Sequence, residues 1–229
     1  MRLLLFDLDG TLMRTGGAGL VAMRRAAAAL FGDALSFDGV ELAGGLDPHI
    51  FFEAARRGGF AATEDHHAEF RARYLAELER ALLEARERIE VLPGVRALLD
   101  EVCARDGVVV GLLTGNYGEG ARLKLKAGDL RWEGFRLTAF GDEADDRPGL
   151  VALALERMAA LTGARHAPER ALVIGDTPKD VACARAHGVP CLAVATGRFD
   201  VASLAAAGAD HVAEDLSDPA LVRRFLDAG

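Results

Sequence analysis

Short apolar runs that alternate with helical patterns constrain the fold of this chain more than any other feature. The runs cover residues 3–8, 108–113, 137–140, 171–174 and 191–195, with a last one near 210–213. A strand that is buried on both faces is apolar along its whole length, so these runs indicate a parallel sheet covered by helices on both sides. The sequence therefore predicts an α/β fold with a Rossmann-like parallel sheet.

A helical segment interrupts this alternation soon after the first apolar run. Helical patterns cover residues 18–31, 47–57 and 64–88, and Pro93-Gly94 then breaks the chain. Further helices are predicted at residues 95–105, 150–161 and 180–187, between the later apolar runs. We therefore predict a discontinuous α/β core, residues 1–14 and 91–229, and an inserted α-helical cap domain, residues 15–90.

The composition excludes several classes of function. A formal charge of −8 disfavours nucleic acid and anionic membranes as partners. No apolar segment reaches the ~18 residues of a membrane span, and Asp7 interrupts the first run after four apolar residues, too early for a signal peptide. The three cysteines form no CxxC motif, which argues against a disulfide framework or a zinc site. We expect a cytoplasmic protein.

Polar residues follow four of the apolar runs, at the points where the predicted strands end. Taken run by run, they are Asp7 and Asp9; Thr114, Gly115 and Asn116; Arg147; and Asp176 and Asp180. Because ligands of open parallel sheets bind beyond the carboxyl ends of the strands, we expect these residues to converge on one crevice. Neighbouring carboxylates need a compensating cation, and Mg²⁺ prefers oxygen ligands. Such a site indicates phosphoryl transfer, in which a carboxylate can act as a covalent nucleophile.

Two motifs resemble those of a known family. The run DLDGTL, which begins at Asp7, matches the DxDGT motif of the haloacid dehalogenase superfamily, and GDTPKD, which begins at Gly175, is similar to its GDTxxD motif. Thr114 and Arg147 look like the second and third motifs of that superfamily. The resemblance spans the chain and is greatest to phosphoglycolate-phosphatase-like members, which carry a helical cap inserted just after the first motif.

The resemblance assigns roles to the four aspartates. Asp7 would attack the phosphorus atom, and Asp9 would protonate the leaving oxygen and then activate water against the aspartyl-phosphate. Mg²⁺ would be held by the carboxylates of Asp7 and Asp176 and by the backbone carbonyl of Asp9. Asp180 would support the metal through water or through bonds to its ligands.

The resemblance also assigns the phosphate-binding groups. Thr114, Gly115 and Asn116 would bind the phosphoryl oxygens, and Arg147 would offset the negative charge. Arg147 departs from the family, which usually has a lysine before the proline, and it follows the acidic stretch 142–146, so a surface ion pair is the alternative. Lys124 and Lys126 are alternative candidates for this role, although we expect both to be solvated helix residues.

These observations predict a phosphoric monoester hydrolase that depends on Mg²⁺ and acts on a small-molecule phosphate ester, as a monomer or homodimer. A phosphoglycolate-like or sugar phosphate substrate is consistent with the resemblance, but the turn at residues 44–47 lacks the basic and hydroxyl side chains common in similar proteins. The alternatives are a sugar-phosphate mutase of the same superfamily and a catalytically silent binding protein. A dehalogenase is disfavoured because Asp9 is present, and dehalogenating relatives lack this second acid.

Overall fold

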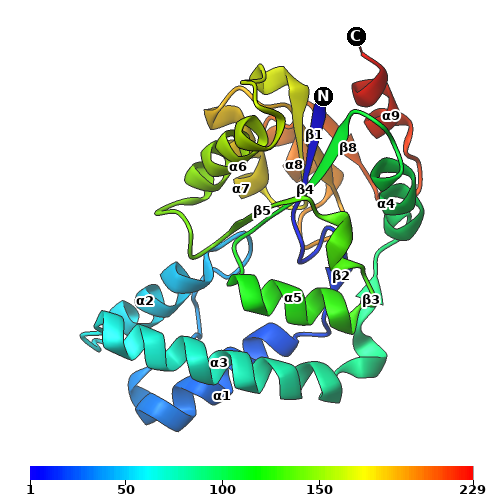
Figure 1. The fold of residues 1–229 in the computed structure, drawn as a ribbon. Coiled ribbons are helices and arrows are strands. Elements are labelled where there is room, and N and C mark those ends of the chain that lie inside the picture. Colours follow the sequence, from blue (N-terminus) through cyan, green and yellow to red (C-terminus); the bar gives the residue numbers. More distant parts are fainter. Residues whose placement is uncertain (229) are drawn as a thin grey trace.

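A six-stranded parallel sheet forms the centre of the computed structural model, which describes residues 1–228 (Figure 1). Its strand order is β5-β4-β1-β6-β7-β8, and every neighbouring pair is parallel. The strands are β1 (Arg2–Phe6), β4 (Val108–Thr114), β5 (Leu137–Phe140), β6 (Ala171–Gly175), β7 (Cys191–Val194) and β8 (His211–Ala213). The predicted α/β fold with a parallel sheet is confirmed.

Helices cover both faces of the sheet. They are α4 (Val95–Cys103), α6 (Arg147–Thr162), α7 (Pro178–Ala186), α8 (Val201–Ala206) and α9 (Ala220–Asp227). Successive side chains of a strand point to opposite faces, so Leu3 and Leu5 of β1 pack in the cluster that includes α6 and α7. Leu4 and Phe6 pack in the cluster that includes α4 and α9. Figure 1 shows these two helix pairs on opposite sides of the sheet.

A helical segment lies at the end of the sheet toward which β1 runs (Figure 1). It contains α1 (Ala18–Phe31), α2 (Asp47–Arg57) and α3 (Glu64–Glu84), and we call the residues between β2 (Met13–Arg14) and β3 (Glu90–Val91) the cap segment. β2 and β3 pair antiparallel and so bring the two ends of the cap segment together. Aromatic rings of α2 and α3 stack in its interior, among them Phe51, Phe70 and Tyr74.

Helix α5 (Gly118–Ala127) belongs to the chain after β4, yet it lies against α3 of the cap segment (Figure 1). Tyr117, directly before α5, is fully buried in the same cluster as Tyr74. The short 3₁₀ turns are η1 (Gly32–Ala34), η2 (Arg86–Arg88), η3 (Trp132–Gly134) and η4 (Pro168–Arg170). Helix α5 therefore connects the sheet edge to the cap segment.

Several helix boundaries differ by a few residues from those predicted, and two of these differences have a clear physical reason. Helix α3 ends at Glu84 rather than at 88, because the chain tightens into the 3₁₀ turn η2 before it pairs with β2. Helix α6 begins at Arg147 rather than at 150, because the Asp146 side chain caps it by accepting a hydrogen bond from the Gly149 amide at 2.7 Å. The earlier start places Arg147 in the first turn of the helix, toward the sheet edge where the aspartates lie.

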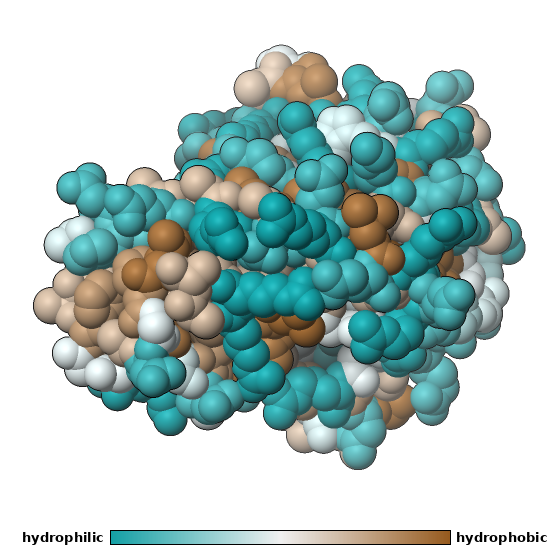
Figure 2. All heavy atoms as spheres, turned by 90° about the horizontal axis from the view of Figure 1, so that it is seen from below, coloured by the Kyte–Doolittle hydropathy of each residue, from teal (hydrophilic) through white to brown (hydrophobic). Residues whose placement is uncertain are grey.

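Hydrophilic side chains predominate on the face that Figure 2 shows, and hydrophobic ones form separate patches there. The exposed large hydrophobic residues of the cap helices include Val21, Leu30 and Leu83. Among residues 1–228, no helix combines the length and apolar character needed to cross a membrane.

Candidate active site

The ends of neighbouring strands position the predicted residues. Asp7 directly follows β1, and its amide donates a hydrogen bond of 2.9 Å to the Ile174 carbonyl of β6. Asp176 directly follows β6, and Thr114 is the last residue of β4. Gly10 turns the chain after Asp7 with φ of 85°, and a Cβ there would lie 2.4 Å from Oδ2 of Asp176. Only glycine fits this conformation and this close approach.

Three buried carboxylates, which we call the acid cluster, meet at this edge of the sheet. Asp7, Asp176 and Asp180 each place a carboxylate oxygen within 4.8 Å of the others. Burial, with the neighbouring carboxylates, raises the pKa of Asp7 to about 7, although the Arg147 guanidinium opposes the shift. Burial and the charges of Asp7 and Asp180 raise the pKa of Asp176 to about 8. The acid cluster thus favours proton uptake, or a cation in its place.

Arg147 is the cation that the structure places in the acid cluster. It is buried, and Nη2 lies 3.1 Å from Oδ1 of Asp7, while Nε and Nη2 both donate to Oδ1 of Asp180. Oδ2 of Asp180 accepts bonds from the amide and the hydroxyl of Thr177, at 3.0 and 2.7 Å. Arg147 is therefore not a surface residue, and Asp180 is engaged in holding Arg147 and the start of α7.

The acid cluster has the chemistry of a site for a hard divalent cation. One guanidinium faces three carboxylates, and within residues 1–228 the side-chain hydrogen bond to Asp176 comes from the Thr11 hydroxyl alone, at 3.3 Å. Oxygen donors with residual negative charge match the preference of Mg²⁺. The Asp9 carboxylate lies outside the cluster, so only its backbone could contribute to such a site.

Asp9 is held by a second set of polar side chains. Its Oδ2 accepts hydrogen bonds from Nζ of Lys124 at 2.5 Å and from Nδ2 of Asn116 at 2.8 Å. Asn116 also donates to Oγ1 of Thr114 at 2.7 Å and accepts from Lys124 at 2.5 Å. The Asp9 side chain is still 41% exposed, so it is oriented by its partners yet accessible to a ligand.

Comparison with known proteins adds the family. The family model of haloacid dehalogenase-like hydrolases matches residues 1–188. This chain is a haloacid dehalogenase-like hydrolase. The resemblance inferred from the two aspartate motifs is thereby confirmed. No curated protein sequence matches the chain.

Solved structures of similar fold carry different activities in their names. A hydrolase from Pseudomonas syringae is 24% identical over 100% of both chains, with a TM-score of 0.70. A beta-phosphoglucomutase from Clostridium difficile is 15% identical over 98% of this chain and 96% of that one, with a TM-score of 0.69. A predicted phosphoglycolate phosphatase from Haemophilus somnus 129pt is 18% identical over 97% and 98%, with a TM-score of 0.64. At these identities the likeness establishes the fold and not the substrate.

The expectation that Lys124 of this haloacid dehalogenase-like hydrolase is a solvated helix residue is wrong. Its side chain is 6% exposed and paired with Asp9, whereas Lys126 on the same helix is exposed. The signal was present in the helical spacing. Ala121 and Leu125 share the buried face of α5 with Lys124, so that face turns inward and carries the ammonium group with it.

A cavity of about 630 Å³ joins the acid cluster of this hydrolase to the cap segment. The turn before α2 closes part of it, because the Asp47 amide donates to the Gly115 carbonyl at 2.7 Å. Oδ2 of Asp47 accepts a bond of 2.9 Å from the Tyr117 amide, and burial raises the pKa of Asp47 to about 7. A Cβ on Gly115 would lie 1.9 Å from the Gly45 carbonyl oxygen, so Gly115 is needed where the two loops touch.

Proposed function

We propose that this protein is a Mg²⁺-dependent phosphatase that hydrolyses a small-molecule phosphomonoester through an aspartyl-phosphate on Asp7. One observation carries the proposal. The Asp7 carboxylate lies within 4.8 Å of two other buried carboxylates and 3.1 Å from the Arg147 guanidinium, at the end of a cavity large enough for a small ester. A nucleophilic carboxylate beside fixed positive charge is what phosphoryl transfer requires.

In the first step Asp7 attacks phosphorus, and the bond between phosphorus and the leaving oxygen breaks. Asp9, two residues later on the same loop, gives that oxygen a proton. In the second step Asp9 takes a proton from water, which attacks phosphorus and releases Asp7. Lys124 and Asn116 support this role, because their bonds to Oδ2 fix the orientation of the Asp9 carboxylate.

Thr114 and Arg147 support binding of the phosphoryl group. Oγ1 of Thr114 accepts from Asn116, and among the described residues no acceptor is bonded to its hydroxyl hydrogen, which is left to donate to a phosphoryl oxygen. The Arg147 guanidinium would offset the charge on Asp7 and on the phosphoryl oxygens.

The acid cluster supports the proposed metal. Asp7, Asp176 and the backbone carbonyl of Asp9 would hold Mg²⁺, with Asp180 in support through its bonds to Arg147. When bound, the ion would neutralise negative charge on the carboxylates and on the transferring phosphoryl group.

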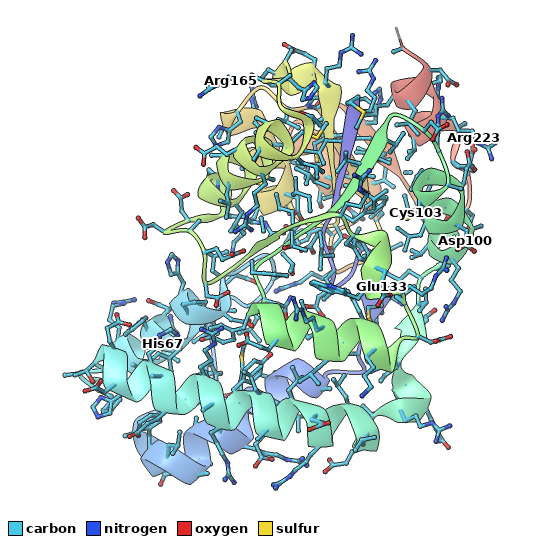
Figure 3. The ribbon with its side chains drawn as sticks, in the orientation of Figure 1. His67, Asp100, Cys103, Glu133, Arg165 and Arg223 are labelled. Atoms are coloured by element: carbon cyan, nitrogen blue, oxygen red, sulfur yellow. The ribbon has the colours of Figure 1, made fainter. Side chains whose placement is uncertain are left out.

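Phosphate release from 4-nitrophenyl phosphate tests the proposal. We expect turnover in the presence of MgCl₂, none with EDTA, and a loss of at least about 10³-fold in Asp7→Asn, which removes the nucleophile. Asp100→Asn is the matched control, because Asp100 is an exposed aspartate on α4 (Figure 3). Full activity of Asp7→Asn would refute the proposal. Conversion of glucose 1-phosphate in the presence of a bisphosphate primer would instead identify a mutase.

A further inference from the structure

The Tyr74 hydroxyl is a buried polar group without a hydrogen-bond partner among the described residues. Tyr74 lies on α3 of the cap segment and is fully buried. Its Oη has no hydrogen-bond partner in the part of the chain that the structure describes, and no other buried side-chain nitrogen or oxygen there shares this state. A buried hydroxyl without a partner costs free energy, so its retention calls for a ligand.

The hydroxyl group lies on the wall of the active-site cavity, beside the group that holds Asp9. Tyr74 and Lys124 both line the cavity. A Cβ built on Gly19 would lie 3.7 Å from Nζ of Lys124 and 4.0 Å from Oη of Tyr74, so both polar tips face the space beside Gly19. Since Asp9 is the proposed donor to the leaving oxygen, the Tyr74 hydroxyl faces the leaving group rather than the phosphoryl group.

Apart from a few polar groups, the cap side of the cavity wall is apolar. The cap segment lines the cavity mainly with glycines and aliphatic side chains, among which are Leu20, Met23, Leu42 and Ile50. Apolar walls of this kind bind ligands by burying apolar surface, and the few polar groups fix the orientation. A sugar with several hydroxyl groups would leave most of them unpaired against this wall.

The cations of the cavity already have carboxylate partners. Lys124 pairs with Asp9, Arg147 with Asp7 and Asp180, Arg14 with Glu90, and Arg198 with Glu41. The Asp47 carboxylate also lines the cavity. Arg14 and Arg198 are at least half exposed, so water screens their charges, whereas the two buried cations, Lys124 and Arg147, are paired inside the site. An anionic leaving group at the cap side would therefore meet carboxylates and no unpaired buried cation among the described residues, which disfavours its binding.

We propose that the cap side of the cavity binds an uncharged, largely apolar leaving group that carries one oxygen atom, and that this oxygen bonds to Oη of Tyr74. This inference rests on the proposed phosphatase function. It assigns the substrate to the monophosphates of neutral alcohols that carry one oxygen besides the ester oxygen. It argues against phosphorylated hydroxy acids and against bisphosphates.

Three esters of matched length test the substrate class: butyl phosphate, 4-hydroxybutyl phosphate and 3-carboxypropyl phosphate. We expect kcat/KM of the wild-type protein to be highest for the hydroxybutyl ester, about 3- to 10-fold above the butyl ester. The carboxypropyl ester should be the poorest substrate. Tyr74→Phe should bring the hydroxybutyl ester down to the level of the butyl ester. A preference for the carboxypropyl ester, or an equal loss for all three in Tyr74→Phe, would overturn the inference.

Tyr117→Phe is the matched control. Tyr117 is also fully buried, but its hydroxyl bonds to Nε2 of His67 at 2.8 Å, and the residue does not line the cavity. His67 belongs to α3, and its ring packs against Phe51 and Phe52 of α2 (Figure 3). We expect Tyr117→Phe to lower the melting temperature and to leave the ranking of the esters unchanged, whereas Tyr74→Phe changes the ranking without lowering the melting temperature.

A binding measurement separates this inference from the proposed function. Calorimetric titration of the Asp7→Asn protein with the three esters needs no turnover, and the same ranking is expected there. If 4-nitrophenyl phosphate is not hydrolysed by the wild-type protein, the proposed function fails, while the ranking by calorimetry still decides the inference. Equal affinity for the butyl and hydroxybutyl esters would refute it.

Discussion

Replacing Asp176 by asparagine is expected to stabilise the protein in the absence of metal and to abolish its response to Mg²⁺. Asp176 is buried, and its carboxylate lies within 4.8 Å of those of Asp7 and Asp180. Asparagine has nearly the same shape and can still accept the hydrogen bond of the Thr11 hydroxyl, so the substitution chiefly removes a charge. Burial and the charges of Asp7 and Asp180 disfavour this charge, and the Arg147 guanidinium opposes them less strongly.

The size of the effect follows from the distance. Two like charges 4.8 Å apart repel by about 3 kcal/mol at an effective dielectric constant of about 20. A single repulsion of this size gives the magnitude that we expect, so Asp176→Asn should raise the free energy of unfolding of the metal-free protein by about 3 kcal/mol. For a chain of this length each kcal/mol shifts the melting temperature by about 2–4 °C, so we expect a rise of about 6–12 °C.

The stabilisation expected for Asp176→Asn should increase with pH. Because the pKa of Asp176 rises to about 8 on folding from a model value of 3.8, the folded metal-free protein binds more protons than the unfolded one between about pH 4 and pH 8. Stability of the wild-type protein in EDTA should therefore fall as pH rises through this window, and the advantage of Asp176→Asn should grow. Bound Mg²⁺ requires deprotonated carboxylates, so its stabilisation of the wild-type protein should also grow with pH.

Differential scanning calorimetry at pH 5.5 and pH 7.5 measures the melting temperatures of the wild-type protein and of Asp176→Asn, each with EDTA and with MgCl₂. The wild-type protein should gain stability from Mg²⁺ at pH 7.5, because the ion binds the folded acid cluster and not the unfolded chain. Asp176→Asn should melt higher in EDTA and show no Mg²⁺ shift. A lower melting temperature of the variant in EDTA, or an intact Mg²⁺ shift, would refute this view of the acid cluster.

Substitutions at three other residues, Lys124, Arg147 and Gly115, test separate parts of the site. Lys124→Met should lower kcat about 10- to 100-fold in steady-state kinetics, because it removes the ammonium group that orients the Asp9 carboxylate. Lys126→Met, on the exposed face of α5, should leave kcat unchanged, and equal effects of the two substitutions would contradict the role of Lys124. Arg147→Met should lower the free energy of unfolding of the metal-free protein, measured in urea, by about 3–5 kcal/mol. Arg147→Lys should lose less because it keeps the positive charge, and equal losses in the two variants would argue against a charge effect. Gly115→Ala should raise KM, because its Cβ would clash with the Gly45 carbonyl and push the turn before α2 away from the sheet edge. An unchanged KM would refute a role for this contact in substrate binding.

The sheet and the acidic residues at its edge could be predicted because they follow from local patterns. Apolar runs mark strands that are buried on both faces, and parallel strands end at the same edge. Asp7, Thr114 and Asp176 therefore meet without any knowledge of the loops. Arg147 could be placed by its motif, but not its bond to Asp180, which depends on where α6 begins.

The roles of Lys124 and Tyr74 could not be predicted in the same way, because each depends on the contact between α3 and α5. These helices lie far apart in the sequence, and no local sequence pattern in either helix indicates that they pack together. The buried face of α5 can be found from the spacing of Ala121 and Leu125. That the face meets Asp9, and that the Tyr74 hydroxyl is left without a partner, follows only from the packed structure.

Detection of the phosphoryl group on Asp7 tests the central claim most directly. Asp9→Asn should slow the second step, so acid quenching of this variant during turnover of 4-nitrophenyl phosphate should trap the aspartyl-phosphate. We predict by mass spectrometry that the added phosphoryl mass lies on the peptide that carries Asp7, and that Asp7→Asn abolishes it. A phosphoryl group on another residue, or undiminished phosphate release from the protein without Asp7, would contradict the account.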